Sequence, residues 1–306
     1  MTGAAPGASE STSPATYSEW ERVEACPICG SDGRAVVDSE ASVVRCTDCG
    51  HRYVDPRPTQ AEVTRGYSLP TTYDDWVSEA EARESMWRRR FNQVLGEDPP
   101  GRLLDVGGGI GTFLAIARER GWSVEGTEVS STAVAKALQQ HGITIRLGIV
   151  EEAAPAGPYD VICLWHVIEH LPNPGGTLRF CRGLLADNGK IILAMPNDGE
   201  AKRAPTVIAN LARRGLGRTP SSRYKVLSPG IESHIQHFNP RSIRCLLGQC
   251  GFLVKRVTVD DASPRRSRLG ALVFRGRVLL TRLTPFNFGH EMLVIAALGP
   301  GSAADG

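Results

Sequence analysis

No uninterrupted apolar run in this 306-residue chain comes close to the roughly 18 residues that a membrane span requires. The first residues, Met1 to Ser18, also lack the basic start and the apolar core of a secretory signal. We therefore expect no transmembrane segment and a cytoplasmic location. Hydrophobic residues form 41% of the chain and charged residues 22%, which excludes a mostly disordered protein and leaves room for about two domains.

Acidic residues are absent from two long segments in the last third of the chain. Residues 201–231 contain seven basic residues and residues 264–289 contain six arginines, and neither segment contains Asp or Glu. The overall net charge of +2 hides this asymmetry, because residues 201–306 carry 17 basic and 5 acidic side chains. These inserts are either solvated basic faces or surfaces for an anionic ligand.

The eight cysteines do not suggest disulfides, because a chain without a secretory signal more often uses paired cysteines for metal. Two C-x-x-C pairs, each followed by glycine, are separated by 16 residues. They supply four thiolates for a closed tetrahedral structural Zn²⁺ site, Cys26, Cys29, Cys46 and Cys49. The segments 34–38 and 42–46 between them alternate like a hairpin, which predicts a zinc ribbon over residues 21–57. The other four, Cys163, Cys181, Cys245 and Cys250, are expected in the core.

The role of the ribbon stays open between a structural appendage and a nucleic-acid binder. Residues 21–57 carry seven acids and five bases, which disfavours contact with phosphates. Four cysteine ligands leave no open position for catalysis at the metal. We expect His51, just beyond Cys49, to be an exposed turn residue rather than a further ligand.

Strand-like and helix-like segments alternate from Gly101 onward. The apolar run 102–106 leads into Gly107-Gly-Gly-Ile-Gly111, and a helical pattern over 112–120 follows. A second strand over 123–127 ends at Glu128, and further strands are expected near 143–147, 159–164 and 190–194. This order predicts an α/β fold with a doubly wound, mostly parallel sheet.

The glycine run departs from the dinucleotide fingerprint G-x-G-x-x-G, because Thr112 occupies the third glycine position. The pattern Asp105-x-Gly107-x-Gly109-x-Gly111 instead resembles the first motif of class I S-adenosylmethionine-dependent methyltransferases. The runs 159–174, 184–197, 233–240 and 246–252 resemble later motifs of that family. The resemblance covers residues 101–260 and 288–298. It implies a seven-stranded sheet whose last strand is antiparallel, here joined to an N-terminal zinc ribbon. The antiparallel closing pair would be the segments 252–259 and 291–297.

The resemblance also implies S-adenosylmethionine as cofactor and a set of residues that bind it. Asp105 would orient the glycine loop and the cofactor's ammonium group, and Glu128 would accept hydrogen bonds from both ribose hydroxyls. The expected cofactor-binding residues are Asp105, Gly107, Gly108, Gly109, Gly111, Glu128, Val129, Trp165 and His166. The residue that contacts adenine stays open, because the stretch 148–152 begins with apolar residues where related proteins often have an acid.

The segment His166-x-x-Glu169-His170 matches a metallopeptidase pattern, but it follows an apolar strand and ends at Pro172, which disfavours a metal-binding helix. Some methyltransferases have E-x-x-E-H at this place and use a divalent ion. This chain has His166 in place of the first glutamate, which disfavours a metal.

Methyl transfer to a hydroxyl requires a base. His166 is the first candidate, with His234 and His237 second; the alternative is that these histidines only hydrogen-bond the backbone.

We expect the acceptor to be a hydroxyl or amine of a sugar, a nucleotide-linked sugar or a secondary metabolite. The basic inserts favour an anionic or carrier-linked acceptor, or peripheral contact with a membrane. An rRNA or tRNA methyltransferase with a zinc module is the alternative, although we do not expect nucleic acid as a partner; an inactive cofactor-binding scaffold is a third class. The oligomeric state stays open.

The expected domains are a disordered tail 1–20, the ribbon 21–57, a helical cover 58–100, the methyltransferase domain 101–298 and a tail 299–306.

Overall fold

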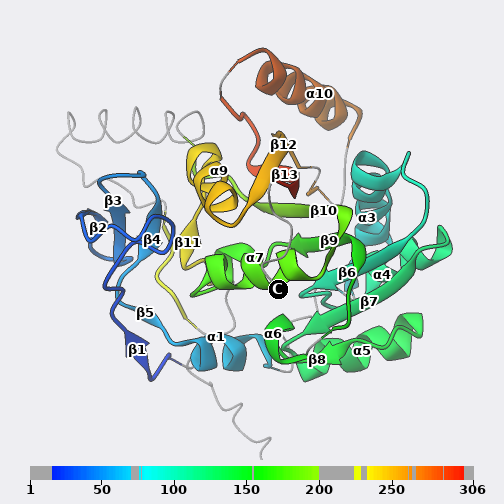
Figure 1. Ribbon diagram of the computed structural model, residues 1–306, viewed down its shortest axis with the longest axis horizontal. Helices are drawn as coiled ribbons and strands as arrows, with labels where there is room; N and C mark the ends of the chain where they lie inside the picture. The colour runs from blue at the N-terminus through cyan, green and yellow to red at the C-terminus, as the bar shows by residue number, and fades with distance from the viewer. Residues whose placement is uncertain are drawn as a thin grey trace, which may run out of the picture.

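A seven-stranded sheet forms the centre of the molecule in this computed structural model (Figure 1). Its strand order is β12-β13-β10-β9-β6-β7-β8. Only β13 runs against its neighbours, since it pairs antiparallel with both β10 and β12 while the pairs among β6 to β10 are parallel. The fold class predicted from the sequence is therefore confirmed. The strands are β6 (Arg102–Val106), β7 (Ser123–Glu128), β8 (Arg146–Leu147), β9 (Tyr159–Trp165), β10 (Leu185–Pro196), β12 (Phe252–Val259) and β13 (Glu291–Leu298).

The structure describes residues 16–69, 76, 78–153, 155–199, 224–228, 233–260, 262–263, 267–284 and 286–299. The basic insert expected at 201–231 lies outside the described residues except for 224–228. Among the described helices, none has the length and apolar character to cross a membrane.

Both faces of the sheet are covered by helices, so successive residues of the central strands are buried on opposite sides. Leu104, Ile162 and Leu193 pack with α7 (Pro174–Gly183) and α9 (Pro240–Gln249) on one face. Leu103, Cys163 and Ile192 pack on the other face. The helices on that second face are α3 (Ala80–Leu95), α4 (Thr112–Glu119) and α5 (Ser131–His141). This two-sided burial explains the short continuous apolar runs of the sequence.

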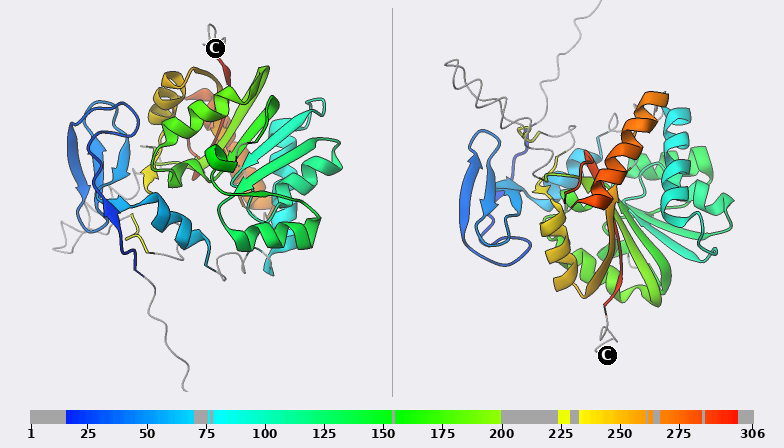
Figure 2. Two further views of the ribbon diagram at one scale, coloured as in Figure 1. Left: turned by 60° about the horizontal axis from the view of Figure 1, so that its bottom comes forward. Right: turned by 90° about the horizontal axis from the view of Figure 1, so that it is seen from above.

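The N-terminal cysteine segment forms the expected hairpin, and a distant part of the chain extends it into a four-stranded sheet. The order is β11-β4-β3-β2, with β2 (Arg34–Asp38), β3 (Val43–Cys46), β4 (Arg52–Val54) and β11 (Gln236–His237). Figures 1 and 2 show the ribbon, in blue, beside β11. Its buried Tyr53 belongs to the same apolar cluster as Phe238 of the central domain. The ribbon is therefore packed onto the domain.

The expectation that His51 is an exposed turn residue is wrong. Its side chain is fully buried, and its ring lies 4.9 Å from that of Phe238, centroid to centroid. The reason is that β11 pairs with β4 and covers the residues beside it. Burial lowers the pKa of His51 to about 4, so its imidazole is neutral.

Packed structure also occurs within the segment 1–20, which we expected to be a disordered tail. Tyr17 is buried, and its hydroxyl lies 2.6 Å from Oγ of Ser233. Strand β1 (Trp20–Glu21) pairs with β5 (Arg57–Pro58). Burial of the Tyr17 ring accounts for the difference, and residues 1–15 lie outside the described residues.

Four further helical elements complete the part of the chain that the structure describes. Helix α1 (Gln60–Tyr67) and helix α3 lie in the segment expected as a helical cover. The short α6 (Val150–Ala153) and the 3₁₀ turn η1 (Ile168–His170) follow β8 and β9. Helix α10 (Arg268–Leu283) occupies the second basic insert, between β12 and β13.

Candidate active site

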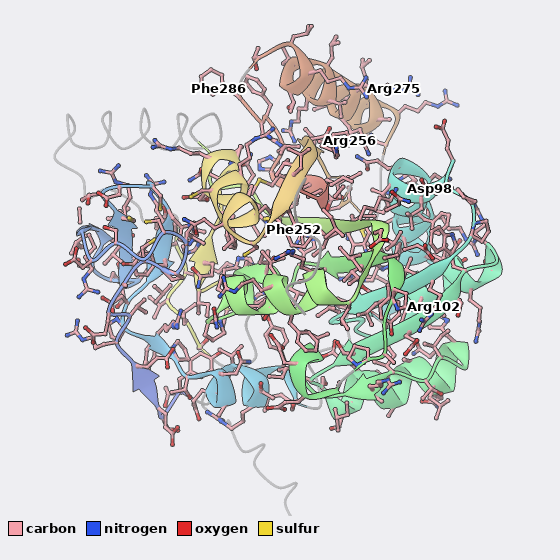
Figure 3. The ribbon with its side chains drawn as sticks, viewed as in Figure 1. Asp98, Arg102, Phe252, Arg256, Arg275 and Phe286 are labelled. Atoms are coloured by element: carbon pink, nitrogen blue, oxygen red, sulfur yellow. The ribbon has the colours of Figure 1, made fainter. Side chains whose placement is uncertain are left out.

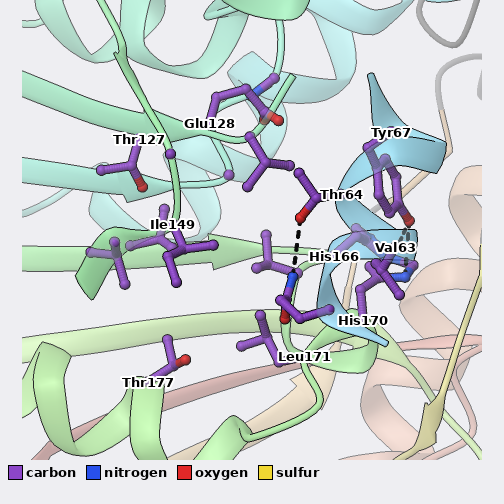
Figure 4. A pocket seen from close by; sticks show the side chains of 18 of the residues that line it. Val63, Thr64, Tyr67, Thr127, Glu128, Ile149, His166, His170, Leu171 and Thr177 are labelled. Atoms are coloured by element: carbon purple, nitrogen blue, oxygen red, sulfur yellow. Dashed lines mark hydrogen bonds between the residues drawn. The ribbon is translucent and has the colours of Figure 1, made fainter. Parts of the chain in front are cut away.

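A cavity of about 500 Å³ opens at the carboxyl ends of β6, β7 and β9, the edge at which open α/β sheets bind ligands. Helix α1 closes it from the other side, with Val63, Thr64 and Tyr67 facing the interior (Figure 4). Apolar and polar side chains contribute about equally in number, but apolar atoms form most of the lining surface. A cavity of this size and character suits an organic cofactor or substrate.

The glycine loop between β6 and α4 forms part of the cavity wall. Gly107 has φ +72°, and a Cβ there would lie 2.5 Å from Cγ2 of Val167. Gly109 has φ +54° and lies against Trp76, whose ring would be 3.1 Å from an added Cβ. The missing side chains therefore let bare backbone border the cavity.

Glu128 lies at the end of β7 with its carboxylate held by two backbone amides. Its Oε2 accepts from the amide of Gly109 at 2.9 Å, and its Oε1 accepts from Ser130 at 2.9 Å. The side chain lines the cavity, and burial raises its pKa. The arrangement presents a fixed acceptor to any ligand hydroxyl that enters.

Asp105 is buried behind the glycine loop and is not among the residues lining the cavity. Its Oδ1 has no hydrogen-bond partner among the described residues. Burial raises its pKa well above the usual range, and the charge of Glu128 raises it further. A positive ligand charge near these two carboxyl groups would relieve both effects.

The predicted cofactor residues therefore divide into two groups. Gly108 and Gly111, like Asp105, do not line the cavity. A Cβ at Gly111 would lie 3.0 Å from Cβ of Ala137, so this glycine lets α4 approach α5. The predicted residues that do line the cavity are Gly107, Gly109, Glu128, Val129, Trp165 and His166.

His166 follows β9 with φ +56°, a left-handed conformation that is uncommon outside glycine. Its Nδ1 lies 3.2 Å from Oε1 of Glu169 and 4.0 Å from Oε2 of Glu291, and its Nε2 lies 3.7 Å from Oδ2 of Asp260. The Arg90 guanidinium lies 2.9 Å from Nε2. Loss of hydration alone would lower the pKa of His166, but the hydrogen bonds with Asp260 and Glu169 raise it to about 10.

Both ring nitrogens of His166 are engaged, Nδ1 with Glu169 and Nε2 with Arg90, so neither is free to accept a proton from a substrate. Arg90 and Asp260 form a buried ion pair beside it, and the guanidinium stacks on Trp87 and Trp165 at 4.7 and 5.2 Å from the ring centroids. This network holds His166 in place. It counts against His166 as the base in this arrangement.

His170 has the opposite character, and sequence reasoning did not select it. Its Nδ1 lies 2.8 Å from the carbonyl oxygen of Ser233. A carbonyl only accepts, so Nδ1 carries the proton and Nε2 is left as an acceptor. The Tyr67 hydroxyl lies 2.9 Å from Nδ1 and 3.1 Å from Nε2 (Figure 4). Both residues line the cavity, and the one sequence signal was the position of His170 in H-x-x-E-H.

The other two predicted histidines lie behind the cavity wall. The His234 ring lies 5.0 Å from that of His170, and His237 in β11 packs on Tyr224 at 4.7 Å, centroid to centroid. Neither is among the described residues that line the cavity. Donor atoms of Glu169, His170 and His234 lie within 4.8 Å of one another, but Glu169 is already ion-paired with His166, so we assign no metal to this group.

The four cysteines of the ribbon meet at one point. Sγ of Cys26 lies 3.6 Å from that of Cys49, Cys29 and Cys46 are separated by the same 3.6 Å, and all four sulfurs lie within 4.8 Å of one another. Zn–S bonds of about 2.3 Å in a tetrahedron place sulfurs about 3.8 Å apart. Burial raises the pKa of the Cys26 thiol to about 12, so a cation is needed to hold it as a thiolate. The geometry and the donor set fit structural zinc.

A family model described as a methyltransferase domain matches residues 80–257, more than half of the chain. The chain belongs to this methyltransferase domain family. The matched range contains the glycine loop, Glu128 and the H-x-x-E-H segment, so most of the cavity lining belongs to the matched domain, while α1 and Trp76 lie before it.

Curated relatives of this methyltransferase domain are ubiquinone biosynthesis O-methyltransferases. The one from Caulobacter sp. (strain K31) is 32% identical over 154 residues, which cover 48% of this chain and 57% of the relative. The one from Bradyrhizobium diazoefficiens is 28% identical over 195 residues, covering 62% and 75%. The chain thus spans little more than half of the first relative.

Solved structures of methyltransferases share the fold. Magnesium protoporphyrin IX methyltransferase from Synechocystis PCC 6803, solved with bound SAH, has a TM-score of 0.52 and 15% identity, covering 79% of this chain and all of that one. A methyltransferase from Thermotoga maritima, titled a possible histamine N-methyltransferase, has a TM-score of 0.50 and 13% identity, covering 77% and 99%. At such identities the similarity concerns the fold alone.

Proposed function

We propose that the chain transfers a methyl group from S-adenosylmethionine to a hydroxyl of a small molecule. The observation that carries the proposal is the position of Glu128 at the carboxyl end of β7. Its side chain accepts a hydrogen bond from the Gly109 amide and lines the cavity. Membership of the methyltransferase domain family and the similarity to proteins named O-methyltransferases support it.

The chain's own residues fit this cofactor. The Glu128 carboxylate would accept hydrogen bonds from the ribose hydroxyls, and the bare backbone at Gly107 and Gly109 leaves room for the methionine portion. Ile149 and Val150 line the cavity beyond β8, where we assign the adenine contact left open by the sequence. The unpartnered Asp105 oxygen and buried Glu128 favour a positively charged ligand. When bound, the sulfonium supplies an activated methyl group.

His170 is our candidate for the proton acceptor. The Ser233 carbonyl fixes its tautomer, so the lone pair lies on Nε2, which is 3.1 Å from the Tyr67 hydroxyl and 4.0 Å from Oε1 of Glu169. Nε2 of His170 would take the proton of the acceptor hydroxyl as that oxygen is methylated. Tyr67 would orient the hydroxyl from α1.

His166 would instead hold the loop after β9 through its contacts with Glu169 and Arg90. His234 backs the His170 ring, and His237 belongs to the ribbon sheet. The roles predicted for these three as bases remain predictions, with backbone and loop support as the alternative. The zinc held by Cys26, Cys29, Cys46 and Cys49 is assigned a structural role only.

The cavity walls favour an acceptor with an apolar or aromatic body. Val63, Val106, Ile149, Val167 and Leu171 line it. A free sugar would bury many hydroxyls against a lining surface that is mostly apolar, and only some of them would find a partner among side chains such as Thr64, Asn173 and Thr177. We therefore place a hydroxylated aromatic metabolite ahead of the sugar and nucleotide-linked sugar of the initial prediction, and ahead of an amine.

The test is transfer from methyl-labelled S-adenosylmethionine to three separate acceptors: a hydroxylated aromatic compound with an apolar chain, a nucleotide-linked sugar, and total RNA. We expect the label on the aromatic hydroxyl, located by mass spectrometry. Label on RNA would instead support the alternative that the acidic ribbon disfavours. Transfer to none of the three, under conditions in which the cofactor binds, would contradict the proposal.

A further inference from the structure

Helix α10 carries a row of large apolar side chains that face solvent. None of its described residues is buried. Leu269, Leu272 and Leu283 are 69%, 66% and 72% exposed, more than most large apolar residues of the described chain. The exposed apolar residues of the helix are Leu269, Leu272, Val273, Leu279, Leu280 and Leu283.

These six residues lie on one face. At about 100° per residue they fall within an arc of about 120° around the helix axis. The opposite side, with Phe274 and Val278 partly buried, rests on β12. The helix therefore has two apolar sides, of which the inner one packs on the sheet and the outer one is uncovered by the described residues.

Arginines border the outer apolar face on both sides. Arg268, Arg275 and Arg282 recur every seven residues along one border, and Arg277 lies on the other. Residues 267–290 contain no Asp or Glu. Figure 3 shows Arg275 and Phe286 at the outer edge of the molecule. Apolar residues flanked by long cationic side chains are typical of helices that lie in the plane of a lipid interface.

We propose that α10 docks on an anionic lipid surface, with its apolar face among the acyl chains and its arginines at the headgroups. Charge decides this occupant. A second copy of the helix would place arginine rows against apolar or arginine-bearing surfaces, because the helix offers no acid to pair with them. A lipid surface of negative charge complements both features at once.

The orientation of α10 is fixed to the sheet. Asn287, buried just after the helix, donates from Nδ2 to the Thr258 carbonyl at 2.9 Å, and Nδ2 of Asn197 donates to the Asn287 carbonyl at 3.0 Å. Of the strands joined by this insert, β12 ends immediately before Asp260 and β13 begins at Glu291, and both acids face His166. Docking would therefore hold these active-site segments close to the lipid surface.

The test is co-sedimentation of the full chain with phosphatidylcholine vesicles that do or do not contain phosphatidylglycerol. We expect binding only to the anionic vesicles, weakened by salt. The double variant Leu272→Glu/Leu279→Glu should reduce it at least tenfold. Val36→Glu is the matched control, because Val36 on β2 is 73% exposed on the ribbon; it should leave binding unchanged.

A second pair of variants tests the charge. Arg275→Gln should weaken vesicle binding about fivefold, whereas Arg244→Gln on the exposed side of α9 should not. Because the altered α10 side chains are exposed, circular dichroism should show that every variant folds. Absence of binding to anionic vesicles at low salt, or equal binding by wild type and double variant, would overturn the proposal. So would an α10-dependent dimer, or an α10-dependent complex with an acidic protein, in place of vesicle binding.

Discussion

Nε2 of His51 lies 2.9 Å from the side-chain oxygen of Gln236, across 185 positions of sequence. The other end of the same amide donates to the Leu171 carbonyl at 3.1 Å, next to His170. One residue earlier, the Ile235 amide donates to the Glu169 carbonyl at 3.0 Å. The zinc ribbon therefore stabilises, through β11, the loop that carries the candidate base. A ribbon that was only an appendage would make no such contacts.

Replacing Gln236 with leucine should destabilise the protein by about 1–3 kcal/mol, because the buried His51 and Leu171 groups lose their partner. Urea unfolding followed by circular dichroism measures this. Val36→Ala, at an exposed position of the same ribbon, should stay within about 0.5 kcal/mol of wild type. Equal stability of wild type and Gln236→Leu would show that the bridge does not contribute.

Loss of the ribbon metal should reach the active site. Cys26→Ser should abolish stoichiometric zinc, lower the melting temperature and reduce methyl transfer, since β11 and the His170 loop lose their support. Metal content by mass spectrometry, thermal unfolding and turnover are the measurements. Cys245→Ser, at a half-buried cysteine of α9, should keep its zinc. A Cys26→Ser protein with zinc and full activity would contradict the claim that the zinc ribbon supports the His170 loop.

Gly107→Ala should weaken binding of S-adenosylhomocysteine at least tenfold. The alanine would have to keep φ near +72° and place its Cβ 2.5 Å from Val167, so the loop must shift. Gly183→Ala is the control, because a Cβ there meets nothing within 4 Å at the end of α7. Calorimetry compares the two; similar affinities would mean that the glycine loop does not border the cofactor.

Sequence patterns predicted the parts of this molecule whose signals are local. The glycine loop, Glu128 at the end of β7 and the paired cysteines each lie within a short segment with its own spacing rule. The errors arose where partners are distant in sequence. Burial of His51 depends on β11, and the pKa of His166 depends on Asp260, Glu169 and the nearby Arg90.

Tyr67 and His170 were missed for the same reason, since only the folded chain brings α1 across the loop after β9. The packing of Tyr17 against Ser233, within the expected tail, depends on the same kind of distant pairing. Contacts between residues that are distant in sequence produce no local periodicity, so a sequence pattern does not reveal them.

The charge of His166 should make stability depend on alkaline pH. Its folded-state pKa of about 10 lies above the ordinary value of about 6.5, so its stabilising contribution is complete below about pH 6.5 and is lost as the pH rises toward 10. Urea unfolding between pH 6 and pH 10 should show a steeper decline for wild type than for His166→Gln. His141→Gln is the control, because burial lowers the pKa of His141. Parallel pH profiles for wild type and His166→Gln would contradict the raised pKa of His166.

His170→Ala should lower kcat by about 10²- to 10⁴-fold while the affinity for S-adenosylhomocysteine changes little. Tyr67→Phe should show a smaller loss of the same kind, because it keeps the ring and removes the hydroxyl. His234→Ala and His237→Ala should retain most of kcat, since neither residue lines the cavity. Turnover and calorimetry on the same preparations separate chemistry from binding. A His170→Ala enzyme with normal kcat would remove this residue from proton transfer.

The central claim is that the cavity at the ends of β6 and β7 binds S-adenosylmethionine through Glu128. Calorimetric titration of the full chain with S-adenosylhomocysteine tests it most directly. We predict saturable binding at one site, weakened at least tenfold in Glu128→Ala because hydrogen bonds to a buried carboxylate are lost. The matched variant Glu125→Ala, at a partly exposed position of the same strand, should bind like wild type. No binding by wild type, or equal binding by Glu128→Ala, would contradict the account.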